Sequence, residues 1–326
     1  MTLLQVENMA IEYGGGARPV RAVDGISFAV APGEILGIVG ESGCGKSTVG
    51  FSLMRLLPEI ARVASGSVQF AGQDLLKASS NAMRALRGNK IAMIFQDPMT
   101  SLDPNFTIGD QLIEPMREHL GLSAGDARKR AIELLTRVGI PAASDRIDRY
   151  PHEFSGGMRQ RVVIAIALSC DPQLLICDEP TSALDVTVQA QILALLRHLQ
   201  TDRPDTGIIM ITHDLGVVAQ LCNRVAVMYA GQIIEQGTVR EIFTDPQHPY
   251  TRGLLASLPG QVKKGERLQA IEGVVPDMSR PPAGCRFQAR CPVALPICSE
   301  PPPFVRLGDR IVACVHTEAK EVAHAS

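Results

Sequence analysis

The chain has 326 residues, with 34 acidic and 32 basic side chains and a formal net charge of −2. This length predicts two structural units, or one large domain with an appendage. Hydrophobic residues make up 45% and charged residues 20%, which excludes general disorder. Because there is no basic excess, and aromatic residues are only 4% with no tryptophan, the composition disfavours a nucleic-acid partner.

No apolar run reaches the length of a membrane-spanning helix, and the first residues lack a signal-peptide pattern. A cytoplasmic location is therefore expected.

Short apolar runs alternate with helical stretches along the first 250 residues. Strands are predicted at 26–30, 35–39, 91–95, 174–177, 208–212 and 225–229. Helical stretches are predicted from the end of a glycine-rich loop to about 57, and at 109–140, 155–169 and 187–200. This alternation indicates an α/β fold with a mainly parallel sheet that is covered on both faces.

After about residue 250 the pattern changes. Eight prolines occur between Pro276 and Pro303, and hydrophobic periodicity disappears. This composition predicts an irregular, crosslinked appendage rather than a helix or a sheet layer. Four of the eight cysteines also crowd into this tail, and in a large cytosolic chain such a cluster is more typical of a metal site than of disulfides. They are Cys285, Cys291, Cys298 and Cys314.

A phosphate-binding loop is predicted at residues 40–47, which fit G-x-x-x-x-G-K-[ST] between a strand and a helix. Its backbone N–H groups and the helix N-terminus would surround phosphate oxygens. Lys46 would supply charge to the β- and γ-phosphates, and Ser47 would ligate Mg²⁺. Because a helix N-terminus lowers thiol pKa, Cys44 could be unusually reactive. The expected nucleotide-binding residues are Gly40, Glu41, Ser42, Gly43, Cys44, Gly45, Lys46, Ser47 and Thr48.

A second nucleotide motif is predicted at the end of the apolar strand at 174–177, where two acidic residues follow directly. Asp178 is expected to hold Mg²⁺, and Glu179 to orient or deprotonate the attacking water. By itself the pair could be an acidic turn, but the phosphate loop favours the Walker B interpretation.

Residues 154–160, Phe-Ser-Gly-Gly-Met-Arg-Gln, resemble the signature motif of the ATP-binding subunits of ABC transporters. Ser155 can cap a helix whose first N–H groups point outward, next to Gly156 and Gly157. The resemblance implies that these three residues contact the nucleotide of a facing subunit. The sequence departs from the common form, because Met158 and Arg159 separate the glycines from the glutamine.

Further positions match the same family. Gln96 resembles the Q-loop glutamine, which senses the metal, and residues 182–185 resemble the D-loop. His213 resembles the switch histidine, which contacts the γ-phosphate. Tyr13 resembles the aromatic residue that stacks on adenine, although a Tyr at a strand end is also commonly a packing residue. The resemblance thus adds Gln96 and His213 to Glu179 as catalytic residues, and Gln96 to Ser47 and Asp178 as Mg²⁺ ligands.

The resemblance implies a fold and a domain organisation. The fold is that of a P-loop NTPase of the ABC ATPase class, with a RecA-like core, an antiparallel β subdomain and an α-helical subdomain. The nucleotide-binding domain would span residues 1–250, with the helical subdomain at about 97–165, and a Cys/Pro-rich extension would span 251–326. Two such domains would enclose ATP and Mg²⁺ in a sandwich dimer.

Residues 246–251, the following Leu254-Leu255 and the cysteine-rich tail resemble one branch, the dipeptide/oligopeptide and nickel importers. This implies an ATPase that powers the import of di- or oligopeptides from the cytoplasmic face of the membrane. Its partners would be two permease subunits, a second ATP-binding subunit (a distinct chain or a second copy) and an extracytoplasmic substrate-binding protein. Nickel, glutathione or another small solute is the alternative cargo. A soluble ABC ATPase and an iron–sulfur redox sensor are less favoured alternatives.

The tail cysteines have the spacing C-x5-C-x6-C-x15-C, which lacks the paired C-x2-4-C ligands of common zinc sites. Four thiolates can hold a [4Fe–4S] cluster, and some members of the branch are thought to do so. The alternatives are a zinc site in which His316 replaces Cys314, and four thiols without a metal.

Overall fold

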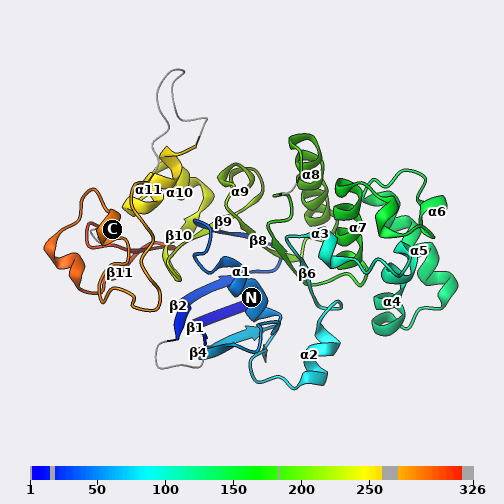
Figure 1. Cartoon of the computed structure of the whole chain (residues 1–326), viewed down its shortest axis with the longest axis horizontal. Helices are drawn as coiled ribbons and strands as arrows, with labels where there is room; N and C mark the ends of the chain where they lie inside the picture. Colours follow the sequence, from blue (N-terminus) through cyan, green and yellow to red (C-terminus); the bar gives the residue numbers. More distant parts are fainter. Residues whose placement is uncertain (1, 15–18, 183, 259–270, 318–326) are drawn as a thin grey trace, which may run out of the picture. The chain divides into compact units, whose positions relative to one another are not determined.

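The computed structural model describes residues 2–14, 19–182, 184–258 and 271–317 (Figure 1). The chain forms two compact units, each built from segments that lie far apart in the sequence. Unit 1 comprises Met1–Leu3, Val30–Glu34 and Gln73–Ile211, and unit 2 comprises Leu4–Ala29, Ile35–Gly72 and Thr212–Ser326. The cysteine-rich tail therefore belongs to the same unit as the N-terminal strands and the phosphate loop.

An antiparallel sheet contributes to unit 2. In it β1 (Leu4–Tyr13) lies between β2 (Val20–Val30) and β4 (Ala61–Phe70), and it pairs with β4 in the antiparallel direction. Ile26, Phe28 and Val30 are buried, while the residues between them are more exposed. The predicted alternation is therefore confirmed, in a strand that begins six residues earlier than expected.

A second group of strands in unit 2 is mixed. Strand β3 (Ile35–Val39) is fully buried and runs parallel to β9 (Arg224–Tyr229). Strand β9 pairs in the antiparallel direction with β10 (Gln232–Thr238). The helices of this unit are α1 (Lys46–Leu53), α9 (Leu215–Leu221), α10 (Val239–Thr244) and α11 (Pro249–Ala256).

The tail adds two strands that the sequence interpretation missed. Strand β12 (Arg310–Ala313) pairs with β10, and β11 (Phe304–Leu307) pairs with β12, both in the antiparallel direction. Between them Gly308 takes a φ of 63°, as a tight turn requires. The expectation that the tail forms no sheet layer is therefore wrong for this hairpin, although its proline-rich part contains only the short 3-10 helices η3 (Gln288–Arg290) and η4 (Pro296–Ser299) among its described residues.

Three parallel strands form the centre of unit 1. Strand β7 (Leu174–Asp178) pairs with β6 (Ile91–Ile94) on one side and with β8 (Gly207–Thr212) on the other, and all three strands are buried. Continuous apolar runs are typical of parallel strands that are covered on both faces. The long helices that follow the signature and Walker B segments are α7 (Gly156–Leu168) and α8 (Val186–Asp202).

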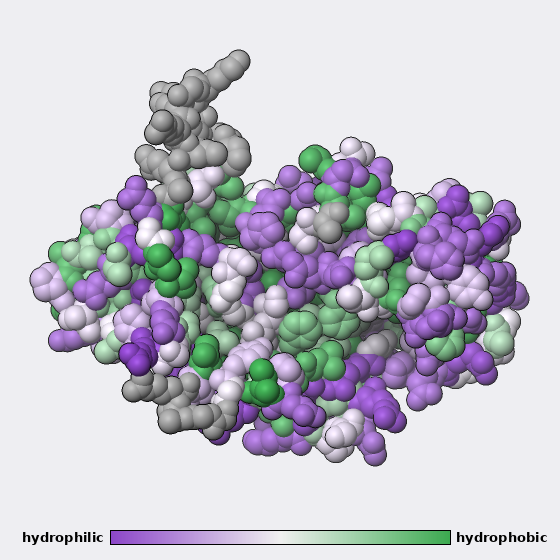
Figure 2. Space-filling view, in the orientation of Figure 1, coloured by the Kyte–Doolittle hydropathy of each residue, from purple (hydrophilic) through white to green (hydrophobic). Residues whose placement is uncertain are grey.

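The predicted helical stretch 109–140 consists of two helices, α4 (Ile108–Leu120) and α5 (Ala124–Arg137). Gly121 ends α4 in the left-handed conformation, and the Ser123 side chain caps α5 by accepting a hydrogen bond from the Asp126 N–H. Both helices have one buried apolar face, and the surface of α4, α5 and the short α6 (Ala143–Arg146) is mostly hydrophilic (Figure 2). Unit 1 also contains β5 (Gln73–Asp74), α2 (Ser80–Leu86), α3 (Pro98–Ser101) and the 3-10 helix η1 (Pro151–Glu153).

Within the described residues, no helix combines the length and the apolar character needed to cross a membrane.

Candidate functional site

The predicted phosphate loop lies in unit 2 between β3 and α1. The amine of Lys46, which is 5% exposed, donates hydrogen bonds to the carbonyl oxygens of Gly40 (2.8 Å) and Glu41 (3.0 Å). Gly45 has a φ of 103°, and a Cβ there would lie 2.3 Å from the Ala22 carbonyl oxygen, so no other residue fits. The loop thus encloses the lysine charge that phosphate binding requires.

The tip of the loop is open. Ser42 and Gly43 are exposed, while Ser47 and Thr48 in the first turn of α1 are partly buried. The hydroxyl of Tyr13 lies 3.3 Å from the Thr48 hydroxyl oxygen. The structure therefore places the predicted adenine-stacking residue beside the helix that begins at the phosphate loop.

Cys44 differs from the prediction of a reactive thiol. It is 3% exposed, and burial raises the pKa of its thiol, an effect that nearby Lys46 only partly offsets. The helix N-terminus is present, but desolvation of the thiolate outweighs it. Cys44 is accordingly a packing residue of the loop.

The predicted Walker B residues lie in unit 1. Asp178 is 2% exposed at the end of β7. Glu179 follows in the left-handed conformation (φ 45°), with its N–H donating to the Ile211 carbonyl oxygen at 2.9 Å. The side-chain amide of Gln96 donates a hydrogen bond of 3.0 Å to the Glu179 carboxylate. Two residues predicted from separate motifs are thereby in contact, and the unusual backbone of Glu179 is of the kind found at functional sites.

The signature segment has the predicted geometry. Ser155 is the N-cap of α7, with its hydroxyl 3.4 Å from the Met158 nitrogen. Ser155 and Gly156 are exposed. A Cβ at Gly157 would come within 3.0 Å of the Val188 side chain, which explains the second glycine. The first N–H groups of α7 are therefore accessible to an anion.

The remaining motif residues lie at helix starts. His213 is exposed directly after β8, and the Asp214 side chain caps α9. In the segment 182–185, Asp185 caps α8, and Ala183 lies outside the described residues. His213 belongs to unit 2, whereas Gln96, Asp178, Glu179 and the signature belong to unit 1.

The four tail cysteines line one small cavity in unit 2, together with side chains that include His248 and Phe287. Burial raises the pKa of the thiols of three of them, and the neighbouring cysteines raise it further. These three are Cys285, Cys291 and Cys314. The fold therefore brings the side chains of the four tail cysteines to one cavity, as the prediction of a shared site requires.

The cysteines that line this cavity do not form a metal-binding group in the described part of the chain. Among the residues that the structure describes, no group of three or more His, Cys, Asp and Glu side chains is arranged to hold one. His316, the alternative zinc ligand, places its Nε2 2.7 Å from the Val293 carbonyl oxygen. This hydrogen bond engages only Nε2, and a metal-ligating histidine commonly donates its other ring N–H to a backbone carbonyl, so the contact does not decide the zinc alternative.

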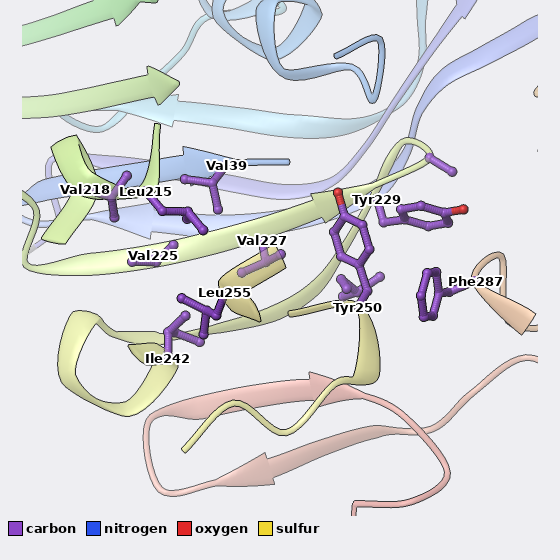
Figure 3. Packing of buried hydrophobic residues seen from close by; sticks show 12 residues of the cluster. Val39, Leu215, Val218, Val225, Val227, Tyr229, Ile242, Tyr250, Leu255 and Phe287 are labelled. Carbon is purple, nitrogen blue, oxygen red and sulfur yellow. The ribbon is translucent and has the colours of Figure 1, made fainter. Parts of the chain in front are cut away.

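Two residues that the sequence interpretation left without a role contact the phosphate loop. The Tyr250 hydroxyl accepts a 2.9 Å hydrogen bond from the Glu41 N–H, and the Arg290 guanidinium forms a bidentate ion pair with the Glu41 carboxylate. Tyr250, Tyr229 and Phe287 pack together with ring centroids 4.6 to 5.4 Å apart (Figure 3). The Pro-Tyr segment at 249–250 was the only sequence signal for this contact, because Arg290 is 249 residues from Glu41.

His248 provides a pH-dependent prediction. It is 1% exposed, its Nδ1 accepts a hydrogen bond from the Tyr250 N–H, and burial lowers its pKa to about 3. An unfolded His binds a proton near pH 6.5, so folding stability is full above that pH and falls as pH is lowered toward 3. Between about pH 6.5 and pH 5 we expect a loss of about 1.5 kcal/mol from this residue.

The measurement compares urea unfolding of the wild type and of His248→Asn, which keeps a side-chain acceptor, at several pH values. The expected result is a smaller pH dependence in the variant. Equal pH dependence in the two proteins would show that His248 does not titrate on unfolding.

The chain resembles known proteins along nearly its whole length. Residues 23–182 match the family model described as ABC transporter, and residues 234–298 match the one described as oligopeptide/dipeptide transporter, C-terminal region. It is 50% identical to the dipeptide transport ATP-binding protein DppD of Bacillus subtilis, over 96% of this chain and 94% of that protein. It is 52% identical to the oligopeptide transport ATP-binding protein OppD of the same organism, over 94% of this chain and 86% of that protein.

Solved structures of ABC ATP-binding proteins are also similar to this chain. One is a dimeric ATP-binding cassette in a post-hydrolysis state bound to ADP and Pi, with a TM-score of 0.66 and 26% identity, covering 73% of this chain and 99% of that one. Another is cbiO1 from Clostridium perfringens, part of the ABC transporter complex cbiONQ, with a TM-score of 0.63 and 30% identity, covering 75% and 91%. The chain belongs to the ABC transporter family, and the predicted ABC ATPase fold is confirmed.

Proposed function

We propose that this chain binds and hydrolyses ATP and thereby powers the import of dipeptides or oligopeptides through separate membrane permease subunits. The observation that carries the proposal is the identity of about half of all residues, over nearly the full chain, to proteins named dipeptide and oligopeptide transport ATP-binding proteins. The match of residues 234–298 to the peptide-transporter C-terminal region supports the peptide branch over other ABC ATPases.

The ATP site would use the residues of the phosphate loop. Backbone N–H groups of Gly40, Glu41, Ser42, Gly43, Cys44 and Gly45 would surround the phosphates, together with Lys46, Ser47 and Thr48 at the start of α1. The present hydrogen bonds of Lys46 to loop carbonyls would be exchanged for phosphate oxygens. Tyr13, beside Thr48, would stack on the adenine. Ser155, Gly156 and Gly157 would contact the nucleotide of the facing subunit through the open N-terminus of α7.

Mg²⁺ would be held by oxygen atoms of Ser47, Gln96 and Asp178, which are the ligand type this ion prefers. When bound, Mg²⁺ neutralises charge on the phosphates. Glu179 would accept the proton of the attacking water, and Gln96, already hydrogen-bonded to its carboxylate, would orient it. His213 would contact the γ-phosphate.

The proposed assembly has two ATP-binding subunits, either two copies of this chain or this chain with a related one. It would attach to two permease subunits at the cytoplasmic face of the membrane and act with an extracytoplasmic substrate-binding protein. Residues 1–250 would form the nucleotide-binding domain, with the helical subdomain at about 97–165, and 251–326 the extension. The net charge of −2 disfavours a nucleic-acid partner.

The cargo is tested by uptake in a strain that lacks the gene. A labelled dipeptide, a labelled pentapeptide, nickel and glutathione are supplied separately, and uptake is compared with and without the plasmid-borne gene. Restoration of peptide uptake alone is the expected result. Restoration of only nickel or glutathione uptake would replace peptides with that cargo, and restoration of none would contradict the transport role.

We also propose that the four tail cysteines hold a [4Fe–4S] cluster with a structural role. Their convergence on one cavity of unit 2 supports this. Four cysteine thiolates are the ligand set that such a cluster requires.

The cluster is tested by purifying the full chain without oxygen and measuring iron, zinc and absorbance near 400 nm. About four iron atoms per chain are expected, and they should be lost in Cys291→Ser but kept in Cys222→Ser, which removes a cysteine outside the tail. Zinc alone, or no metal, would refute the cluster.

A further inference from the structure

Arg290 uses every hydrogen atom of its guanidinium in a contact within unit 2. Its Nη atoms donate to the two Glu41 carboxylate oxygens at 2.8 and 3.0 Å. The three remaining N–H donors of the guanidinium bind the Tyr229 hydroxyl (3.3 Å) and the carbonyl oxygens of Ile271 (3.0 Å) and Glu272 (2.9 Å). Five donors in a planar fork match this set of acceptors, and the three donors of a lysine could not.

The ion pair is largely shielded from water. The Arg290 side chain is 5% exposed and that of Glu41 is 26% exposed. The guanidinium also lies 5.7 Å from the Tyr229 ring centroid and 6.0 Å from that of Phe287. Contact with the carboxylate raises the pKa of Arg290, so its positive charge persists at every physiological pH.

Glu41 is the second residue of the phosphate loop, and its carbonyl oxygen accepts the hydrogen bond from the Lys46 amine. A free carboxylate at this position would repel the phosphates of ATP. Arg290 cancels that charge, and together with Tyr250, which binds the Glu41 N–H, it holds this end of the loop from outside. Without Arg290, the loop would carry an unpaired negative charge close to its ligand.

Arg290 is itself a residue of the cysteine-rich tail, and the local structure of the tail fixes its backbone position. Arg290 ends the 3-10 helix η3, which lies between Phe287 and Cys291, and its own N–H donates to the Phe287 carbonyl oxygen. Nearby, Arg286 is 4% exposed and contacts Asp24 and the Ala230 carbonyl oxygen. These two buried arginines join the tail to other parts of unit 2, and one of them reaches the phosphate loop.

We propose that Arg290 is a positioning residue for nucleotide binding: it neutralises Glu41 and fixes the phosphate loop, so that the C-terminal tail completes the ATP site. This inference rests on the proposed ATPase function. It assigns the tail a role at the nucleotide, in addition to any metal that it holds.

The test measures MgATP binding to the full chain by calorimetry. Arg290→Met should weaken binding about tenfold, within the range that coupled contacting residues show. Arg290→Lys should weaken it about threefold, because the charge remains but the bidentate geometry is lost. The matched control is Arg306→Met, an exposed arginine on β11 of the same tail, which should bind ATP like the wild type.

The decisive variant is the double substitution Arg290→Met with Glu41→Gln. If charge neutralisation is the role of Arg290, removing the Glu41 charge should recover most of the lost affinity. No recovery, with all variants folded by circular dichroism, would show that Arg290 only supports the tail, and wild-type binding by Arg290→Met would overturn the inference outright. Failure of the wild type and of Arg306→Met to bind ATP would instead contradict the proposed function.

Discussion

Replacing Glu179 by Gln is expected to lower ATP turnover about 10²- to 10⁴-fold while MgATP still binds. The substitution keeps the shape of the side chain but removes the group that accepts the proton of the attacking water. Gln96 can still contact the side-chain oxygen of the new residue, as it contacts the carboxylate at 3.0 Å now. Because the phosphate loop is untouched, ATP-bound dimers should accumulate.

The measurement combines phosphate release with size-exclusion chromatography in the presence of ATP. Glu133→Gln is the matched control, because Glu133 is an exposed acid on α5 outside every nucleotide motif. It should hydrolyse ATP at the wild-type rate. Undiminished turnover in Glu179→Gln would show that Glu179 does not accept the proton of the attacking water and that another group does.

Replacing Arg310 by Met is expected to destabilise the tail by about 3 to 5 kcal/mol. Arg310 is 4% exposed on β12, and its Nε donates a 3.1 Å hydrogen bond to Glu235, which is fully buried on β10. Glu235 also accepts from the backbone N–H groups of Gln247 (2.9 Å) and His248 (3.0 Å). Without the guanidinium, a buried carboxylate would lose its only cation among the described residues, and the hairpin would lose a buried side-chain contact with β10.

Urea unfolding followed by circular dichroism measures the loss, and hydrogen exchange of β11 and β12 locates it. The double variant Arg310→Met with Glu235→Gln should recover part of the stability, since no unpaired charge remains. Arg306→Met, on the facing strand but exposed, should change stability by no more than about 0.5 kcal/mol. An unchanged unfolding midpoint in Arg310→Met would mean that the ion pair does not hold the hairpin.

Local sequence patterns predicted the features that depend on residues close together in the sequence, such as buried strands and helix caps. The fully buried strands β3, β7 and β8 appear where short apolar runs predicted them, and Ser155 caps α7 as its place before two glycines indicated. The contact between Gln96 and Glu179 joins residues 83 positions apart, yet both came from motifs with a known order along the chain.

The features that escaped prediction depend on distant contacts or on burial. Arg290 carries no motif of its own, and only the fold brings it to Glu41. The hairpin of β11 and β12 is too short to show a clear period, and its register is set by pairing with β10. For Cys44, the helix terminus was visible in the sequence, but the desolvation that raises its pKa was not. Gly121 and Ser123 are typical of a helix end and a helix start, and they mark the break between α4 and α5. The stretch at 109–140 was nevertheless predicted as continuous, because the hydrophobic periodicity resumes after Ser123.

The most direct test of the account is ATP-driven peptide transport by the purified complex. The chain is co-expressed with its permease subunits and companion ATPase, reconstituted into liposomes, and supplied with ATP on the ATPase side and with substrate-binding protein and labelled peptide on the other. We predict peptide accumulation that requires ATP hydrolysis and is abolished by Glu179→Gln in this chain. Accumulation that is the same without ATP, or ATP hydrolysis that no peptide-loaded binding protein stimulates and that moves no peptide, would contradict the account.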